Sequence, residues 1–190
     1  MTSNELLDSH IEEAETQLKI FRDEIAFLTK EQLNWKYDTR IWTIGEILDH
    51  LVIFNGSYFP IIEKAIHATK DKPEFADVGE NYMHTLTGNM MIKTVRPENR
   101  NRSSAPKLFH PYKTIYDYSI TDKFEAQLTG LIRFMGASKG LNLALVRAYS
   151  PAIKILKFNL GDCYVMMVLH TKRHIEQMMR LAANTGFPKS

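Results

Sequence analysis

Residues 163–181 read CYVMMVLHTKRHIEQMMRL and have the periodicity of one amphipathic helix. At about 100° per residue, His170 and His174 fall on the apolar side of this helix, one turn apart. The other residues on that side are Leu160, Cys163, Met167, Met178 and Leu181. The charged residues lie on the opposite side: Lys172, Arg173, Glu176 and Arg180. The stretch therefore places two imidazoles in an apolar surface.

These two histidines need partners, because a buried polar group left unpaired costs about 1–3 kcal/mol. One interpretation pairs each ring with a polar group on a facing helix. The other is a metal ion, since imidazoles at positions i and i+4 can bind one ion from a rigid base. The glutamate of the HExxH motif is missing from His-Thr-Lys-Arg-His, which argues against a metalloprotease. The pair alone fits core pairing and metal binding equally well.

Length and composition predict a soluble globular protein with one domain spanning residues 1–190. The formal net charge is +2 and the basic residues are interspersed with acids, which argues against nucleic-acid binding. No apolar run reaches the roughly 20 residues of a membrane span, and the first residues do not resemble a secretion signal. We therefore expect a cytoplasmic protein that binds no membrane. The single cysteine, Cys163, is interpreted as a core residue rather than a catalytic thiol.

Two earlier helices are predicted by capping boxes, in which a threonine and a glutamate three residues later satisfy backbone donors reciprocally. Thr2 with Glu5 begins the first helix, and Thr43 with Glu46 begins the second. Each helix carries apolar residues in alternating steps of four and three, which is typical of helices packed in a bundle. In the first helix these residues are Leu7, Ile11, Ala14, Leu18, Phe21, Ile25 and Leu28. In the second they include Ile44, Leu48, Leu51, Tyr58 and Ile62.

His50 lies on the second helix, at the margin of its apolar face, and can turn toward a neighbouring helix. Asp49 and Glu46 point the other way on the helical wheel, so we interpret them as surface residues rather than metal ligands. The sequence therefore offers a third helical histidine beside an apolar surface.

From Ala68 to about Ser119 the chain is rich in proline and polar residues, with helix expected only around residues 81–93. A connection of this length can return along a bundle, so that the second and third long helices run parallel. Three other histidines in or beside it are interpreted as surface residues: His67, His84 and His110.

A third long helix is predicted from about Thr121 toward Tyr149, followed by a connector over residues 152–160. Three glycines lower its helix propensity, and Gly136 is a position where it can break. Polar residues on the inner side of its second half, Ser138, Asn142 and Tyr149, either line a pocket or satisfy one another. Asn159 or Asp162 can then begin the helix that carries His170 and His174.

Three stretches resemble the DinB-like superfamily, including its YfiT-like members: Trp42-Thr-Ile-Gly-Glu-Ile-Leu-Asp-His50-Leu, Asn159-Leu-Gly-Asp and His170-Thr-Lys-Arg-His174-Ile-Glu-Gln177. The resemblance covers nearly the whole chain. It implies an all-α fold, a four-helix bundle with a long crossover between helices 2 and 3, and a homodimer. It also implies one divalent metal ion held by His50, His170 and His174. Gln177, one turn beyond His174, either fixes the tautomer of an imidazole or has a structural role.

Three neutral imidazoles suit zinc or nickel and leave at least one position for water or substrate. The relatives that the resemblance implies include S-transferases that use bacillithiol or mycothiol, a thiol-dependent isomerase, and proteins described only as metal-dependent hydrolases. We therefore predict a metal-dependent enzyme with a small-molecule substrate, and prefer transfer of a low-molecular-weight thiol to hydrolysis. The alternative is a non-enzymatic bundle whose metal is structural or whose histidines only pair with one another. The sequence assigns no general base among Asn142, Tyr149 and Tyr58.

Overall fold

The computed structural model describes residues 1–99, 105–153 and 155–189. Within them the chain is mainly helical, as predicted for an all-α fold, with one small antiparallel sheet. The α-helices are α1 (Ser3–Glu24), α2 (Lys30–Asn34), α3 (Ile44–Thr69), α4 (Leu86–Val95), α5 (Ser119–Ala137) and α6 (Leu160–Ala182). Two short 3-10 turns, η1 (Pro73–Phe75) and η2 (Lys107–Phe109), and two strands, β1 (Arg147–Tyr149) and β2 (Lys157–Asn159), complete the described elements.

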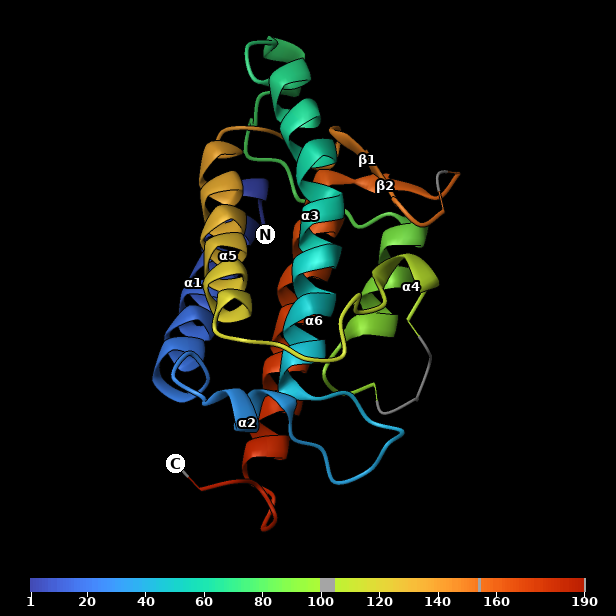
Figure 1. Cartoon of the computed structure of the whole chain (residues 1–190). Helices are drawn as coiled ribbons and strands as arrows, with labels where there is room; N and C mark the ends of the chain where they lie inside the picture. Colours follow the sequence, from blue (N-terminus) through green and yellow to red (C-terminus); the bar gives the residue numbers. More distant parts are fainter. Residues whose placement is uncertain (100–104, 154, 190) are drawn as a thin grey trace.

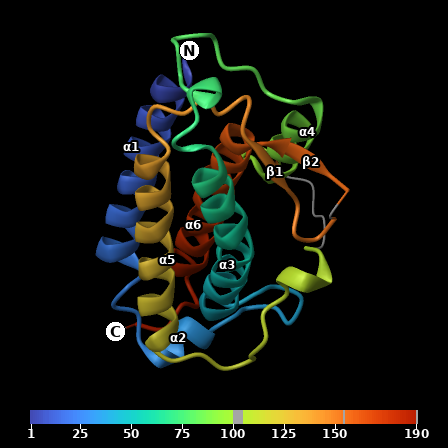
Figure 2. The ribbon, with the colours of Figure 1, turned by 90° about the horizontal axis from the view of Figure 1, so that it is seen from above.

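The four long helices lie side by side (Figure 1). Helix α3 packs against α5 and α6, and α1 packs against the same two helices from the other side. Both views show α3 and α5 running in one direction and α1 and α6 in the other (Figure 2). The parallel run of α3 and α5 is the arrangement that the long crossover between them predicted. Where the chain is described, no helix is long and apolar enough to cross a membrane.

Local sequence determines where the helices begin. Thr2 and Thr43 form the predicted capping boxes, each with the glutamate three residues later. Asn159 caps α6 by accepting a hydrogen bond from the backbone N–H of Asp162 at 2.8 Å. The apolar stripes then face one another, and most of their residues become buried, as at Phe21 and Leu48, whereas Ile11 and Leu28 are partly buried. Burial of these stripes is the main source of stability for the packed helices.

The third predicted helix ends beside Gly136, where the sequence allowed a break, and its extension toward Tyr149 was wrong. Helix α5 ends at Ala137, because Gly140 adopts a positive φ of 85°, which a right-handed helix cannot continue. The chain then forms β1, at the end of the predicted helix, which pairs antiparallel with β2. Strand β2 lies within the predicted connector, residues 152–160. The helical spacing of Ser138, Asn142 and Tyr149 therefore does not reflect a helix.

The crossover between α3 and α5 is attached to the long helices rather than looped out. Helix α4 packs against α6, and η2 packs against α3 (Figure 1). A buried carboxylate, Asp162, accepts hydrogen bonds from the Tyr82 hydroxyl at 2.9 Å and from the Thr85 N–H and hydroxyl at 3.0 and 2.7 Å. The Nδ1 atom of His84 also lies 2.6 Å from this carboxylate, although the side chain is at the surface as predicted. A side chain at Gly88 would collide with Asp162, so glycine permits the close approach of α4.

Candidate metal centre

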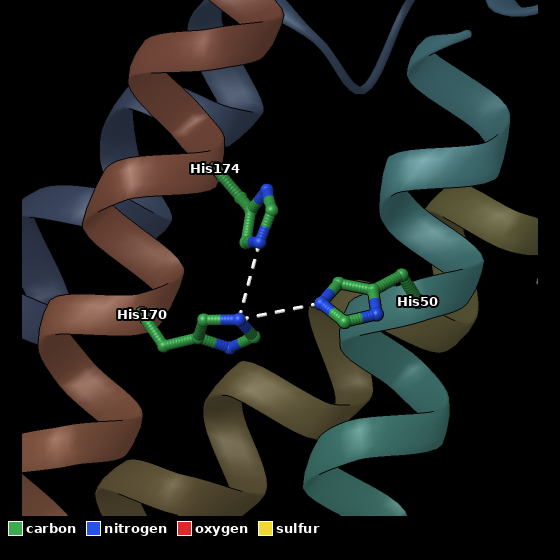
Figure 3. A group of neighbouring side chains, drawn as sticks. All are labelled: His50, His170 and His174. Atoms are coloured by element: carbon green, nitrogen blue, oxygen red, sulfur yellow. Dashed lines mark hydrogen bonds between the residues drawn. The ribbon is translucent and has the colours of Figure 1, made fainter. Parts of the chain in front are cut away.

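Helices α3 and α6 bring the three predicted histidines together. His50 lies in the second turn of α3, and His170 and His174 lie on successive turns of α6. Their rings converge in the space between the two helices (Figure 3). The Nε2 atom of His170 is 3.2 Å from Nε2 of His50 and 3.1 Å from Nε2 of His174. Residues separated by 120 positions in the chain thus form one cluster.

The outer nitrogens of two rings are held by oxygen acceptors. His50 Nδ1 donates to the backbone carbonyl of Phe109 at 2.7 Å, and His174 Nδ1 donates to Gln177 Oε1 at 3.0 Å. Because a neutral imidazole carries one proton, both rings then present an Nε2 lone pair to the cluster. Of the two roles that the sequence left open for Gln177, this hydrogen bond fits the one in which Gln177 fixes the tautomer of an imidazole. Within the described residues, the buried Nδ1 of His170 has no hydrogen-bond partner.

Hydrogen bonding among the three rings leaves the cluster incompletely paired. His170 Nε2 has one proton at most, so it can donate fully to His50 or to His174 but not to both. If His170 instead carries its proton on Nδ1, three lone pairs converge on one point. Tetrahedral zinc with Zn–N bonds of about 2.0–2.1 Å separates its nitrogens by about 3.3 Å. The two spacings from His170, 3.1 and 3.2 Å, are close to that value, and the ligand nitrogens of all three rings lie within 4.8 Å of one another, so this group could hold a divalent ion.

Burial keeps these imidazoles neutral. The exposed fractions of His50, His170 and His174 are 2, 7 and 9%. Loss of solvation lowers the pKa of His174 to about 3 and the pKa of His170 well below its usual range. The pKa of His50 is also lowered, mainly by burial, although its hydrogen bond to Phe109 acts in the opposite direction. Neutral imidazoles with free lone pairs are the form that binds metal ions.

Comparison with known proteins places this chain in a family. A family model of the DinB superfamily matches residues 13–178, a span that includes all three histidines. The chain belongs to the DinB superfamily. The resemblance predicted from the sequence is therefore confirmed. Searches of curated proteins and of solved structures found no match.

Aromatic rings enclose the histidine cluster of this DinB-superfamily chain. The Trp42 ring lies 5.0 Å from the His50 ring, and the Phe54 ring lies 4.2 Å from the His170 ring. Phe109 packs on Phe54 at 5.1 Å. Such walls exclude water and strengthen electrostatic interactions inside the site. Phe54 follows His50 by one helical turn and could have been found by periodicity, whereas the Phe109 carbonyl leaves no signal in the sequence.

Other polar residues singled out in the sequence lie apart from the cluster. Ser138 pairs with the Tyr164 hydroxyl at 2.7 Å, and Asn142 accepts from the N–H of Ala144 at 3.2 Å, so these two satisfy local groups. Tyr149 belongs to β1, and the buried Tyr58 hydroxyl lies 4.0 Å from the sulfur of Met166. In the described residues, none of the candidate bases therefore forms a hydrogen bond with the three imidazoles.

Cys163 and Asp49 complete the comparison with the sequence. Cys163 is fully buried, and burial raises the pKa of its thiol far above the usual range, in agreement with a core role. Asp49 is not part of the histidine cluster, as predicted, but it is half-buried rather than free at the surface, with its carboxylate 2.8 Å from the N–H of Tyr112 and 2.9 Å from the hydroxyl of Tyr116. A helical wheel assigned Asp49 to solvent because it cannot show that the crossover covers that face of α3.

Proposed function

We propose that this chain is a metal-dependent enzyme in which His50, His170 and His174 bind one divalent ion, zinc or nickel. The convergence of the three Nε2 atoms carries this proposal. Two of the lone pairs are directed by hydrogen bonds on the opposite ring nitrogens, an arrangement that is typical of metal-binding histidines. We also infer that the four long helices form the four-helix bundle that the resemblance implies.

A divalent ion with three protein ligands keeps at least one coordination position and would lower the pKa of a water molecule or thiol bound there. The chain's own residues hold the imidazoles neutral and surround them with aromatic rings. The hydrogen-bond partners given for the three rings, apart from one another, are the carbonyl of Phe109 and the carboxamide of Gln177. Neither group is a base, so these contacts of the described residues supply no general base for the nucleophile.

The lack of a general base among these partners favours a thiol over water as the nucleophile. A free thiol has a pKa of about 8.5 and water about 15.7, so a thiol ionises with far less assistance. Because the Cys163 thiol is fully buried, this nucleophile has to come from outside the protein. We therefore propose transfer of a low-molecular-weight thiol such as bacillithiol. A carbon–sulfur bond forms, the leaving group departs with its electron pair, and the thiol proton passes to solvent.

Hydrolysis of a small molecule at the same site is the second candidate, because the open position suits water as well as sulfur. We further propose that the protein acts as a cytoplasmic homodimer, as the resemblance implies. Light scattering after size-exclusion chromatography tests the dimer.

Metal content tests the site. Protein purified without a histidine tag is expected to carry about one equivalent of zinc or nickel, as expected for a single three-ligand site. His170→Ala and His174→Ala should lose that metal, whereas His67→Ala, outside the cluster, should retain it. Wild-type protein with less than about a tenth of an equivalent, unchanged by these substitutions, would refute the metal site.

Activity tests the reaction class. Metal-loaded protein is incubated with bacillithiol and a bimane electrophile, and thioether formation is followed by fluorescence, with His50→Ala as the control. The transferase proposal predicts a rate far above that of His50→Ala. Equal rates for both proteins, together with metal-dependent cleavage of a panel of esters and amides, would instead support the hydrolase.

A further inference from the structure

The acceptor for His50 Nδ1 lies outside the long helices. Phe109 ends η2 in the crossover, and its carbonyl faces His50 at 2.7 Å. Its side chain is 4% exposed and packs on Phe54, which in turn contacts the ring of His170. The orientation of two imidazoles therefore depends on what holds the crossover in place near residue 109.

A carboxylate beside His50 provides that attachment. Asp49 directly precedes His50 on α3, about 100° away around the helix. Its Oδ2 atom accepts from the backbone N–H of Tyr112 at 2.8 Å and lies 2.9 Å from the Tyr116 hydroxyl. The single proton of that hydroxyl is shared between Asp49 and the Lys113 carbonyl, which lies 2.6 Å away. The same turn of α3 therefore holds the crossover at Tyr112 through Asp49. It also places His50 against the carbonyl of Phe109, three residues before Tyr112.

Tyr116 makes this attachment rigid. Asn34 at the end of α2 accepts from the Tyr116 N–H and donates to its carbonyl, both at 2.8 Å. The Tyr116 ring lies against Gly45, where an added Cβ would come within 2.6 Å of the ring. Three residues of the stretch 42–50 therefore act together. Gly45 leaves space for the Tyr116 ring, Asp49 lies beside its hydroxyl, and His50 is the first imidazole of the cluster.

We propose that Asp49 is a positioning residue of the metal site. It holds residues 109–116 so that the Phe109 carbonyl accepts from His50 Nδ1, and this keeps the His50 Nε2 lone pair directed at the ion. The inference rests on the proposed metal site for its effect on affinity. Its effect on the His50 tautomer is independent of metal.

The chain offers a matched control at the other end of the crossover. Asp162 is also a buried acceptor for crossover residues, but it holds Tyr82, His84 and Thr85. Among the interactions given for the described residues, none joins Asp162 to the three histidines. Loss of Asp162 should loosen the crossover and lower stability without changing the tautomer of His50.

The first test measures Co²⁺ affinity by competition with a chelator. Asp49→Ala should weaken binding by about tenfold or more, as loss of outer-shell partners does. Asp49→Asn keeps an acceptor oxygen and should stay much closer to wild type. Asp162→Ala should bind like wild type. Wild-type affinity in Asp49→Ala, or an equal loss in Asp162→Ala, would overturn the proposal.

The second test uses metal-free protein and ¹⁵N chemical shifts of the histidine rings. Wild type, Asp49→Asn and Asp162→Ala should show His50 protonated on Nδ1, whereas Asp49→Ala should show a mixture of tautomers. An unchanged tautomer in Asp49→Ala would refute the positioning role even if wild type binds metal. If wild type binds no metal, the proposed function fails, and the ring shifts still decide this inference. If Asp49→Ala does not fold, Tyr116→Phe removes one of the two bonds and should shift the tautomer in the same direction; an unchanged tautomer there would overturn the proposal.

Discussion

Acidification should destabilise the metal-free protein through its buried histidines. The pKa of His174 is lowered from 6.5 to about 3 in the folded protein. Because the folded pKa lies below the unfolded value, the unfolded chain binds the proton first as the pH falls. Stability is therefore fully present above about pH 6.5 and is lost as the pH falls from there toward about 3.

The loss of folding free energy from His174 at pH 5 depends mainly on the unfolded pKa, because the folded pKa lies well below 5. An unfolded histidine with a pKa of about 6.5 gains about 2 kcal/mol by protonation at pH 5, which the folded chain does not gain if His174 stays neutral. His170 has its pKa lowered in the same direction, mainly by burial, so its protonation in the unfolded chain adds to this loss. Both histidines therefore destabilise the folded state as the pH falls from 7.5 to 5.

Urea unfolding of metal-free protein across this pH range measures the effect. His174→Gln removes one titrating group while keeping a polar side chain, so it should lose about 2 kcal/mol less than wild type between pH 7.5 and pH 5. The quantity compared is the change in the free energy of unfolding with pH. A loss of stability that the substitution causes equally at every pH does not affect this change. If the free energy of unfolding changes equally with pH in the two proteins, the argument that burial holds His174 neutral is refuted.

Three further predictions concern single side chains. Gln177→Leu removes the acceptor of His174 Nδ1 and should weaken Co²⁺ binding about 10–100-fold, measured by chelator competition; unchanged affinity would remove Gln177 from the site. Gly88→Ala forces a methyl group against Asp162 and should lower the free energy of unfolding by about 1–3 kcal/mol in urea titrations, so unchanged stability would contradict the close packing of α4. Cys163→Ala should keep the bimane-coupling activity of wild type, because the buried thiol takes no part in it; loss of activity in a folded variant would contradict the core role.

Local signals explain why much of the fold could be predicted from the sequence. Thr2 and Thr43 cap helices with glutamates three residues away, and such interactions depend on neighbouring residues alone. His170 and His174 share a face because of helical periodicity. Periodicity could not say that His50 would meet them, and that expectation came from the resemblance to the DinB-like superfamily.

The errors arose where distant parts of the chain decide the structure. The helical spacing after Ala137 was overruled by Gly140 and by the pairing of β1 with β2. Asp49 was assigned to solvent because the helical wheel of α3 contains no information on the crossover that covers it. The Phe109 carbonyl was missed for a similar reason, since a backbone acceptor has no side-chain signature.

Anomalous scattering from crystals of untagged protein tests the metal site most directly. Data collected above and below the zinc and nickel absorption edges would locate and identify an ion in one experiment. The metal site predicts a single strong peak about 2.0–2.1 Å from Nε2 of His50, His170 and His174. A map with no peak at this position, in protein whose three rings hydrogen-bond to one another instead, would contradict it.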